Sequence, residues 1–567
     1  MSNEKVINGE IFKRLLIGGA SNLHTNMQEV NDLNVFPIPD GDTGDNMYLT
    51  LKGGLDELNA VSENSLCKEA KALAQGMLLN AHGNSGVILS QLFYGLAEGL
   101  DGLETAEVKE FAKALKQGVK CAYGAVAEPV EGTILTVARE AVENTIEKLE
   151  KDMRLEDFFT LYLSEMKKSL ERTPDLLKTL KEAGVIDSGG AGLVYIIEGF
   201  CKAFGAEVLD EEVAFTSTAQ QKSVDLSKFN ENSVMEFGYC TEFLLQLQHA
   251  KTDISAFKVQ DIIDFLSTVG DSIVAFQTGT IVKVHVHTMT PWKVLQFCQN
   301  YGEFLTLKIE NMTLQHNETH EEPKKSTLKT HVQRARREFA LVVVVSGEGL
   351  IQTFKEMGAD YVISGGQTNN PSSEEFIRAF DEVNADHIFV LPNNSNVIMA
   401  AKQAAEMYGG SDIRVVESKS VGEGYSALSM LDYEIGDADA IESALNEAMQ
   451  NVTTGMVTRA VRTTTLNGVE VTKDDYIGFV SHRMVVSVKE KLDAAKALTD
   501  DIAAGKEFLI VAYGKDATEE ERAAYAAYVS EKHAGVEFYE INGEQEVYDF
   551  LLIVEYKTPI VLQFIKY

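Results

Sequence analysis

The most informative segment of this chain is Asn34-Val-Phe-Pro-Ile-Pro-Asp40-Gly-Asp42-Thr43-Gly-Asp45-Asn46-Met47. Its two prolines favour an extended approach, and its two glycines permit tight turning. Three carboxylates within six residues repel one another unless they are solvated or bind a cation. The segment therefore predicts either a plain acidic turn or a turn that holds a hard cation such as magnesium.

A calcium EF-hand loop is the obvious alternative for a run of aspartates, and the spacing excludes it. Counted from Asp40, an EF-hand would need an oxygen ligand at its fifth position and a glutamate at its twelfth. Gly44 and Leu51 occupy those two positions. The choice between an acidic turn and a magnesium site then depends on the rest of the chain.

Residues 1 to about 204 show helical periodicity interrupted by glycine-rich turns. Within residues 105–123, apolar side chains recur at steps of three and four and form one stripe: Val108, Phe111, Leu115 and Val119. Further turns have the sequences HGNSG (82–86), EGT (131–133) and DSGGAG (187–192). We expect these turns to lie on one rim that carries a site.

The turn at residues 82–86 enters an apolar helix. Backbone N–H groups exposed there, together with the helix dipole, would form a natural cradle for phosphate. The other two turns have the same character, although each is a weak signal when taken alone. No Walker lysine accompanies any of them, which argues against a P-loop kinase.

Length and charge narrow the class of protein. At 567 residues the chain is too long for one hydrophobic core, so about three or four domains are expected. The net charge of -35 predicts that neither nucleic acid nor an anionic membrane is a partner, because phosphates would be repelled. The charge also has a simpler explanation, which is solubility.

The cysteines and the N-terminus predict a cytoplasmic protein. Five cysteines contain no CxxC pair, which fits free thiols in a reducing compartment. The N-terminus lacks the apolar core and cleavage site of a signal peptide. We also find no run of about 18 apolar residues that could span a membrane.

The chain changes character after the helical region, and five segments are expected. A polar stretch separates the helices from a region that mixes a helical segment with strand-like runs, predicted to be a small α/β domain. A charged stretch follows, which is either a linker or a docking strip for an acidic partner. In the last segment, short apolar runs alternate with helices, as in an α/β domain with a mainly parallel sheet. The segments are a helical domain at 1–204, a linker at 205–231, a middle domain at 232–315, a linker at 316–338 and a C-terminal domain at 339–567.

The C-terminal segment shows no nucleotide signature. Residues 347–349 (GEG) follow an apolar run but lack GxGxxG or GxxxxGK[ST]. Four polar turn residues are predicted to cap helices rather than to bind a ligand: Ser364, Gln367, Asn369 and Asn393. We expect this half of the chain to serve in docking and dimerisation.

Taken in order, four segments resemble the nucleotide-binding L-type domain of dihydroxyacetone kinases, and more closely the fatty acid kinase A protein. These segments are NVFPIPDGDTGDNM, HGNSGVILSQ, PVEGTILTVARE and GVIDSGGAGL. The resemblance implies an all-α helical barrel with ATP and magnesium at one rim, followed by a small α/β middle domain. The C-terminal segment resembles, more loosely, the α/β fold of DegV proteins.

Carried over by position, the resemblance implies that Asp40 and Asp42 are catalytic and bind magnesium, with Asn34 as a weaker candidate ligand. The residues that it places at the nucleotide are Thr43, Asn46, Gly83, Asn84, Ser85 and Thr133 at the phosphates, and Asp187 and Gly189 at the nucleoside side. Two positions depart from the pattern. Asp45 stands where a small hydroxyl residue is common and is left out of the ligand set. His82 stands where arginine is common, and its role stays open.

A second metal site is a candidate in the middle domain. His285 and His287 lie two residues apart on a predicted strand and share a face, so they could converge on one ion. Zinc would need a third ligand, and Cys240 is the best available. The alternative is two polar residues on the exposed face of an edge strand. The resemblance favours zinc, because these positions correspond to a zinc site in the fatty acid kinase A protein.

The resemblance implies ATP-dependent phosphorylation of a fatty acid held by a separate DegV-type carrier, giving an acyl phosphate for phospholipid synthesis. A carboxylate with a pKa of about 4–5 is already ionised at neutral pH, so no strong general base is required. A homodimer is expected. Two alternatives are a kinase for a small polyol and an ATP-binding scaffold that responds to lipid. The added domains argue against the first, and the retained Asp40 and Asp42 argue against the second.

Overall fold

The computed structural model describes residues 4–33, 38, 41–59, 61, 64–205, 239–254, 257–266, 268–278, 280–311 and 336–556. They form two compact units. One contains the helical region and the C-terminal region, and the other is the middle region. Each unit is described by itself. The predicted linkers at 205–231 and 316–338 fall almost entirely outside the described residues.

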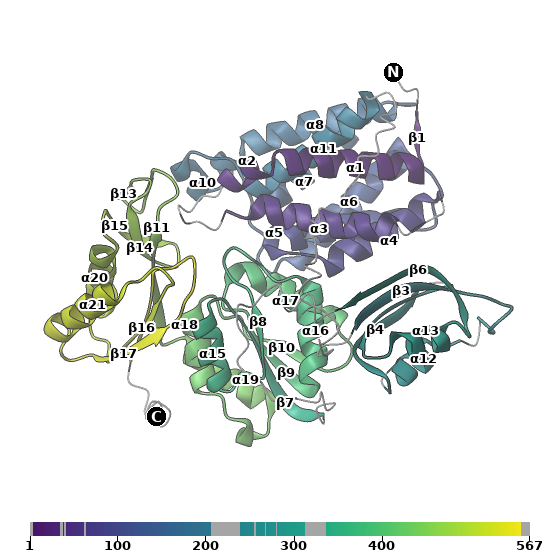
Figure 1. Ribbon diagram of the computed structural model, residues 1–567. Coiled ribbons are helices and arrows are strands. Elements are labelled where there is room, and N and C mark those ends of the chain that lie inside the picture. The colour runs from purple at the N-terminus through teal and green to yellow at the C-terminus, as the bar shows by residue number, and fades with distance from the viewer. Residues whose placement is uncertain are drawn as a thin grey trace, which may run out of the picture. The chain divides into compact units, whose positions relative to one another are not determined.

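The first region is helical, as expected (Figure 1). Two short strands, β1 (Val6–Ile7) and β2 (Ala106–Glu107), pair in antiparallel fashion at one end. The helices are α1 (Gly9–Thr25), α2 (Met27–Asp32), α3 (Thr43–Asn59), α4 (Leu66–Leu79), α5 (Gly83–Gly99), α6 (Val108–Ala125), α7 (Ile134–Glu147), α8 (Leu155–Glu171), α9 (Thr173–Leu176), α10 (Lys178–Ala183) and α11 (Ser188–Gly205).

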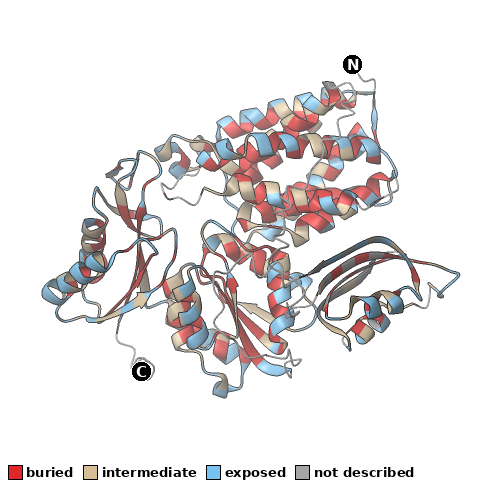
Figure 2. Cartoon of the chain, viewed as in Figure 1, coloured by how far each residue is buried: buried red, intermediate tan, exposed pale blue. Residues whose placement is uncertain are grey.

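The long helices pack around one hydrophobic core, and their buried faces point toward one another (Figure 2). Phe158 and Phe159 of α8 are fully buried, with ring centroids 5.1 Å apart and planes at 73°. Helices α1 and α11 approach closely because both carry glycine at the crossing. A Cβ added to Gly199 would lie 2.3 Å from the carbonyl oxygen of Gly18.

The middle region is a small α/β domain, as expected. Its four strands form one antiparallel sheet in the order β4-β5-β3-β6. The sheet and two helices share a core that includes Phe243, Val284 and Ile262. Its elements are β3 (Tyr239–Leu247), α12 (Val259–Leu266), β4 (Gly270–Thr278), β5 (Ile281–Thr288), α13 (Pro291–Cys298) and β6 (Gly302–Asn311).

The C-terminal region begins with a parallel sheet in the order β10-β9-β7-β8. After β7 the chain adds β8 on one side of that strand and then β9 on the other side. The strand order therefore reverses at β7. Its elements are β7 (Arg337–Val345), α15 (Glu348–Glu356), β8 (Tyr361–Ser364), α16 (Ser373–Val383), β9 (Ala385–Leu391), α17 (Ser395–Met407), β10 (Asp412–Val415), α18 (Val421–Ser429), the 3-10 turn η2 (Tyr433–Ile435) and α19 (Ala438–Met449).

A second sheet follows, and it corrects the expectation of a mainly parallel sheet for the whole segment. Its order is β15-β14-β11-β18-β16-β17, and only β16 and β17 pair in parallel. A hairpin, β12 (Thr464–Leu466) and β13 (Val469–Val471), lies beside it in the chain. The remaining elements are β11 (Val452–Arg459), β14 (Tyr476–Val480), β15 (Arg483–Val488), α20 (Lys491–Ile502), β16 (Phe508–Tyr513), α21 (Glu519–Lys532), β17 (Glu537–Asn542) and β18 (Phe550–Glu555). The strand-like run at 559–564 lies outside the described residues.

The four residues predicted as helix caps in this region are not caps. Ser372 caps α16, and its side chain accepts from the N–H of Glu375 at 3.3 Å. Asn394 caps α17 in the same way. The predicted residues were Ser364, Gln367, Asn369 and Asn393. Asn393 has a positive φ of 55°, and its buried side chain donates instead to the carbonyl of Val344 on β7.

None of the helices among the described residues has the length and apolarity needed to cross a bilayer.

Candidate active site at four helix N-termini

Four of the described helices begin at neighbouring points of the helical region, and each begins at one of the glycine-rich turns. These helices are α3, α5, α7 and α11. The N-terminus of a helix carries about half a positive charge, and its first N–H groups have no partner within the helix. Four such ends in one place favour an anion with several charges, such as the phosphates of a nucleotide.

Direct contacts join these N-termini. The Ser188 hydroxyl, at the start of α11, donates to the Thr43 hydroxyl at the start of α3 at 3.3 Å. Helices α3 and α5 meet at Gly83, where an added Cβ would lie 2.6 Å from the Asn46 amide nitrogen. Gly83 also has a left-handed φ of 57°. The structure therefore brings Thr43, Asn46 and Gly83 close together.

Asp187 joins α7 to α11. Its carboxylate accepts from the N–H of Gly190 at 2.7 Å and also from the N–H of Ile134. Gly189 stands at the same junction, since an added Cβ would lie 3.3 Å from the Ile134 Cβ. Burial raises the pKa of Asp187 to about 6, and the two N–H donors oppose that rise. Asp187 thus holds the N-termini of α7 and α11 together.

The titration of Asp187 gives a prediction about stability. An unfolded Asp has a pKa near 3.9, so between about pH 4 and pH 6 the folded chain keeps a proton that the unfolded chain releases. The stabilising contribution is therefore complete below about pH 4 and is lost as the pH rises through 6. Asp187→Asn cannot ionise. The thermal midpoint of the wild type should fall relative to that of Asp187→Asn between about pH 4 and pH 6, and the difference should stay level at higher pH. Parallel curves for the two proteins would contradict this assignment.

The turn before α3 is braced by a residue that sequence reasoning missed. Asn31 is buried, accepts from the N–H of Gly44 at 2.7 Å and donates to the Asp45 carboxylate at 2.6 Å. The Asp45 carboxylate is therefore held by a residue of α2. Asp45 was left out of the predicted magnesium ligands. No sequence signal marks Asn31, because an asparagine in a helix carries no sign of its partner.

A second missed group braces the turn before α7. The Glu131 carboxylate accepts from Thr136 at 2.6 Å and from the Arg139 guanidinium at 2.8 Å. Burial acts to raise the pKa of Glu131, but hydrogen bonds from Thr136, Arg139 and Tyr123 outweigh it and lower the pKa. Gly132 follows with a φ of 86°. These contacts fix where α7 begins.

The remaining predicted residues of this site fall into three groups. Asn34 and Asp40 lie outside the described residues. Ser85 lies in the first turn of α5, and Asp42 immediately precedes α3, where its carbonyl accepts from the N–H of Asn46 at 2.8 Å. Thr133 is the N-cap residue of α7, and its hydroxyl donates to the Val130 carbonyl at 2.7 Å.

The C-terminal region reaches this site through the turn after β8. The side-chain amide of Asn370 donates to the Asp42 carboxylate. The His82 ring lies 2.8 Å from the Asn370 carbonyl, measured from Nδ1, and His82 forms an isolated antiparallel bridge with Ser372. His82 thus takes part in a contact between the two regions. Asn84 donates to the side-chain oxygen of Asn396, in the first turn of α17, at 3.4 Å.

The groups at this site fit a magnesium ion. The amide oxygens of Asn84 and Asn370 are buried without a hydrogen-bond partner in the described part of the chain. Such oxygens are hard donors, and they lie beside the Asp42 carboxylate and the N-terminus of α5. No group of three or more His, Cys, Asp or Glu that could hold a metal ion is found among the described residues, which exclude Asp40.

The candidate zinc residues are placed by their backbones alone. Cys240 on β3 pairs directly with His287 on β5, and Glu242 pairs with His285. The side chains of Cys240, His285 and His287 lie outside the described set. Directly paired residues of antiparallel strands share a face of the sheet. The register therefore puts Cys240 and both histidines at neighbouring positions.

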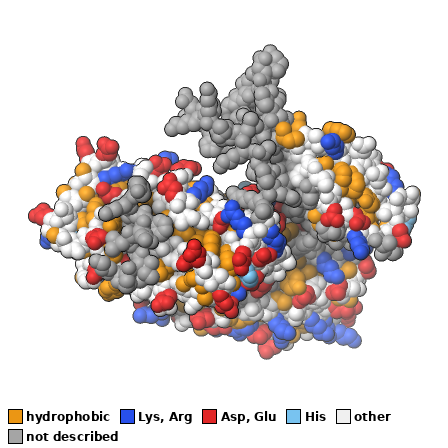
Figure 3. All heavy atoms as spheres, turned by 90° about the horizontal axis from the view of Figure 1, so that it is seen from below, with side chains coloured by type: hydrophobic (Ala, Val, Ile, Leu, Met, Phe, Trp, Pro, Cys, Tyr) orange, Lys and Arg blue, Asp and Glu red, His pale blue; other side chains and the backbone are white. Residues whose placement is uncertain are grey.

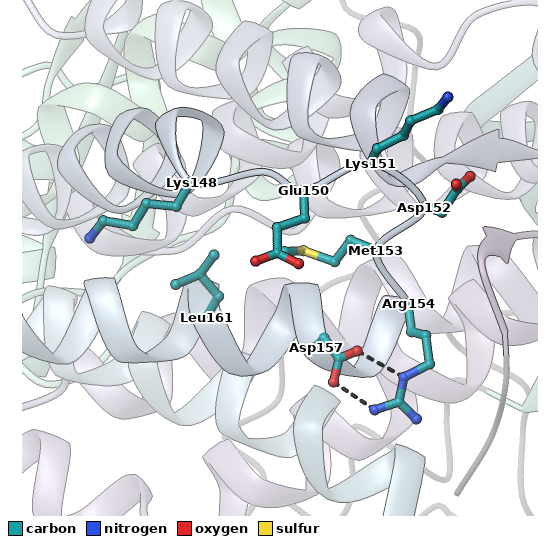
Figure 4. Close-up of a pocket in the computed structure, with 8 residues that line it drawn as sticks. All are labelled: Lys148, Glu150, Lys151, Asp152, Met153, Arg154, Asp157 and Leu161. Carbon is teal, nitrogen blue, oxygen red and sulfur yellow. Dashed lines mark hydrogen bonds and ion pairs between the residues drawn. The ribbon is translucent and has the colours of Figure 1, made fainter.

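Two cavities in the helical region lie away from the predicted nucleotide residues and have charged linings. One, of about 480 Å³, lies between the loop after α7 and helix α8 (Figure 4). Arg154 at its edge is already paired with Asp157 by two hydrogen bonds, of 2.8 and 2.7 Å. The other, of about 580 Å³, is lined in part by Lys113, Lys116 and Arg139. The lining of the first is mainly charged, whereas the second also includes Val119, Tyr123 and Val142.

On one face of the molecule, charged side chains are spread out rather than gathered. On the face shown in Figure 3, acidic, basic and hydrophobic side chains lie among one another. The net charge of -35 therefore does not form a single acidic patch on that face.

Three domain models, two of them from one family, match consecutive parts of the chain. The DAK2 domain matches residues 37–202, which contain all four helix N-termini of the candidate site. The middle domain of the fatty acid kinase A-like (FakA-like) family matches residues 236–319, and the C-terminal domain of the same family matches residues 340–555. The helical region thus belongs to the class of DAK2 domains, which here begins a longer chain.

Relatives match the full length. Protein YloV of Bacillus subtilis (strain 168) is 38% identical over 558 residues, which cover 97% of this chain and 100% of that protein. An uncharacterized protein of Staphylococcus saprophyticus is 37% identical over 557 residues, covering 97% and 99%. This chain belongs to the FakA-like family.

A solved structure matches the C-terminal part. DegV, a fatty acid binding protein from Bacillus subtilis, covers 39% of this chain and 100% of its own, with 15% sequence identity and a TM-score of 0.30. The expected organisation, with a helical first region, a middle domain and a C-terminal α/β region, is confirmed.

Proposed function

We propose that this chain is the ATP-binding component of a fatty acid kinase and phosphorylates the carboxylate of a fatty acid held by a separate DegV-type carrier. The observation that carries the proposal is the convergence of the N-termini of α3, α5, α7 and α11 beside Asp42. That arrangement suits a polyphosphate. Membership of the FakA-like family supports the choice of acceptor.

The chain's part in the reaction is positioning. The acceptor carboxylate oxygen would attack the γ-phosphorus of ATP, and the bond to the oxygen bridging the β-phosphate would break, releasing ADP. The N–H groups at Gly83, Asn84 and Ser85, with the Thr43 hydroxyl, would hold the phosphates in line with the acceptor. Magnesium held by Asp40, Asp42 and Asn34 would, when bound, offset the charge on the phosphates.

The carrier follows from the chemistry of the acceptor. A long acyl chain is poorly soluble because its apolar surface is costly to hydrate. The two cavities described in the helical region lie away from the predicted nucleotide residues. A protein that buries the chain and presents only the carboxylate would solve this problem. A cytoplasmic homodimer that supplies acyl phosphate for phospholipid synthesis is part of the same proposal.

The test is ADP release from ATP and magnesium, with oleate supplied either free or loaded on a cognate DegV-type carrier. We expect turnover only with the loaded carrier. Turnover with dihydroxyacetone in place of oleate would identify a polyol kinase. ATP binding without turnover on any acceptor would point to an ATP-binding scaffold.

We further propose that Cys240, His285 and His287 bind zinc, on the basis of their register in the middle-domain sheet. The purified chain should contain about one zinc per molecule, and Cys240→Ser should lose most of it. Cys121→Ser is the matched control, because Cys121 is a free cysteine on α6. Metal analysis of the three proteins decides the matter. Equal zinc in Cys240→Ser and wild type would rule out this ligand set.

A further inference from the structure

One side chain of the C-terminal region holds the carboxylate that we propose as a magnesium ligand. The side-chain amide of Asn370 donates to the Asp42 carboxylate, although the two residues are 328 positions apart in the chain. A Cβ added to Gly83 would lie 3.4 Å from the same amide nitrogen. Asn370 therefore lies beside both Asp42 and the N-terminus of α5, the groups that would hold the metal and the phosphates.

The turn that carries Asn370 is fixed by its own hydrogen bonds and by the helical region. Within the turn, the N–H of Gly366 donates to the Asn369 carbonyl at 3.1 Å. On the other side, His82 forms an isolated bridge with Ser372, and its Nδ1 lies 2.8 Å from the Asn370 carbonyl. A carbonyl oxygen only accepts, so Nδ1 of His82 carries the proton of this bond. The backbone of Asn370 is thus anchored on the helical region.

Apolar side chains exclude solvent from the same contact. Ala81 and Val87 of the helical region belong to a hydrophobic cluster whose other members come from the parallel sheet and its helices, including Phe376. Asn370 itself is 2% exposed. Its hydrogen bond to the Asp42 carboxylate is therefore made away from bulk water, where a bond to a charged group is stronger.

The other end of the Asn370 amide is unsatisfied. Its oxygen is buried, and no residue in the described part of the chain donates a hydrogen bond to it. The side-chain oxygen of Asn84, in the first turn of α5, is in the same state. Buried polar groups are almost always paired, so an amide that only joined two regions would have both of its ends satisfied. These oxygens beside Asp42 instead indicate a donor or a cation that arrives with the ligand. Magnesium supplies both, because it binds oxygen and keeps several water molecules around it.

A hydrogen bond from Asn370 is compatible with a magnesium ion on the same carboxylate. The two oxygens of a carboxylate offer about four acceptor positions in all. The amide donor is neutral, so it fixes the rotation of the carboxylate without adding a positive charge that would repel the ion. Carboxylates that bind metals are commonly held by such donors, which set their orientation.

We propose that Asn370 is a positioning residue of the magnesium site, and that the C-terminal region thereby contributes a side chain to the active site. The amide N–H holds the Asp42 carboxylate, and the amide oxygen accepts a hydrogen bond from the water around the ion. The inference rests on the proposed function, because it adds a residue to the metal site of that reaction.

The experiment measures binding of manganese, which prefers the same oxygen ligands as magnesium, to the full chain in the presence of ADP. Electron paramagnetic resonance reports the fraction of manganese that stays in solution. Asn370→Ala removes both ends of the amide and should weaken manganese binding about 10- to 100-fold, the usual cost of losing a group that orients a metal ligand. Asn369→Ala is the matched control, because its side chain is exposed in the same turn, and it should bind manganese as the wild type does.

A second readout separates positioning from structural damage. With loaded carrier and ATP, the magnesium concentration that gives half-maximal ADP release should rise in Asn370→Ala about 10- to 100-fold. At saturating magnesium, kcat should recover most of its wild-type value, which a misfolded site could not do. Asn370→Ser keeps a polar side chain in the turn, but its hydroxyl is too short to reach Asp42. It should behave like Asn370→Ala and replaces that variant if thermal unfolding in EDTA shows that the alanine variant is not folded.

Manganese affinity equal to that of Asn369→Ala in a folded Asn370→Ala or Asn370→Ser would overturn the inference. A loss of kcat that saturating magnesium does not restore would overturn it as well. A wild type that binds neither manganese nor ADP would refute the proposed function, and this inference with it. A wild type that binds both but does not phosphorylate carrier-bound oleate would refute the proposed function alone, and the manganese comparison would still decide the role of Asn370.

Discussion

Asp42→Asn should reduce ADP release more than about 100-fold while the chain stays folded. Even residues that only support a metal ligand cost about 10- to 100-fold when they are removed, and Asp42 is proposed as a ligand itself. It stands immediately before α3, beside Asn370 and the N-terminus that would hold the phosphates. An amide in its place keeps the shape but loses the negative charge that binds a hard cation.

The matched control for this variant is Asp45→Asn. Asp45 lies in the same turn and accepts from Asn31 at 2.6 Å, and an amide oxygen can still accept that bond. We expect turnover within about tenfold of the wild type for this control. Turnover by carrier-dependent ADP release and folding by circular dichroism are measured for all three proteins. Asp42→Asn with the activity of Asp45→Asn would remove Asp42 from the metal site.

Gly83→Ala should lower kcat/KM for ATP about 100-fold, because the added methyl group displaces a phosphate-facing side chain. A Cβ at this position would lie 2.6 Å from the Asn46 amide nitrogen, so Asn46 must move. A displacement of about 1 Å in a positioning group can cost about 100-fold in rate. The φ of 57° adds a conformational cost of about 1–2 kcal/mol for alanine.

The control for Gly83→Ala is Gly124→Ala, near the end of α6. No atom lies within 4 Å of a Cβ added at Gly124, and its φ is not in the left-handed region. That variant should keep full activity and gain up to about 1 kcal/mol of stability. Nucleotide titration and thermal unfolding of both variants separate the two effects. Wild-type ATP binding by Gly83→Ala would show that the turn is not the phosphate site.

The local part of the site could be predicted from the sequence. Each glycine-rich segment lies where a helix begins, because its residues and the first apolar positions are neighbours in the chain. That locality placed Thr43, Gly83 and Asp187 at helix N-termini. The sequence predicted only that these helix N-termini lie on one rim. Which of them touch depends on how the helices pack, and the sequence does not show that.

The contacts between distant segments could not be predicted in the same way. Asn370 is 328 residues away from Asp42 in the chain, and its own turn gives no sign of a partner. We expected neighbouring polar residues such as Asn369 to cap helices, and the structure assigns the caps to Ser372 and Asn394. The second sheet was missed for a related reason. Strand β11 is only partly buried, so its apolar pattern is too weak to show that it pairs in antiparallel fashion.

The central claim is that the γ-phosphoryl group moves from ATP to a fatty acid carboxylate, and transfer of label tests it most directly. The chain is incubated with magnesium, ATP labelled at the γ-phosphate and oleate-loaded DegV-type carrier, and the lipid is then extracted. We predict label in a lipid product that hydroxylamine cleaves, as expected for an acyl phosphate, and almost none with Asp42→Asn or with free oleate. Label that remains in ATP, or that appears only as inorganic phosphate, would contradict the assignment of this chain to a fatty acid kinase.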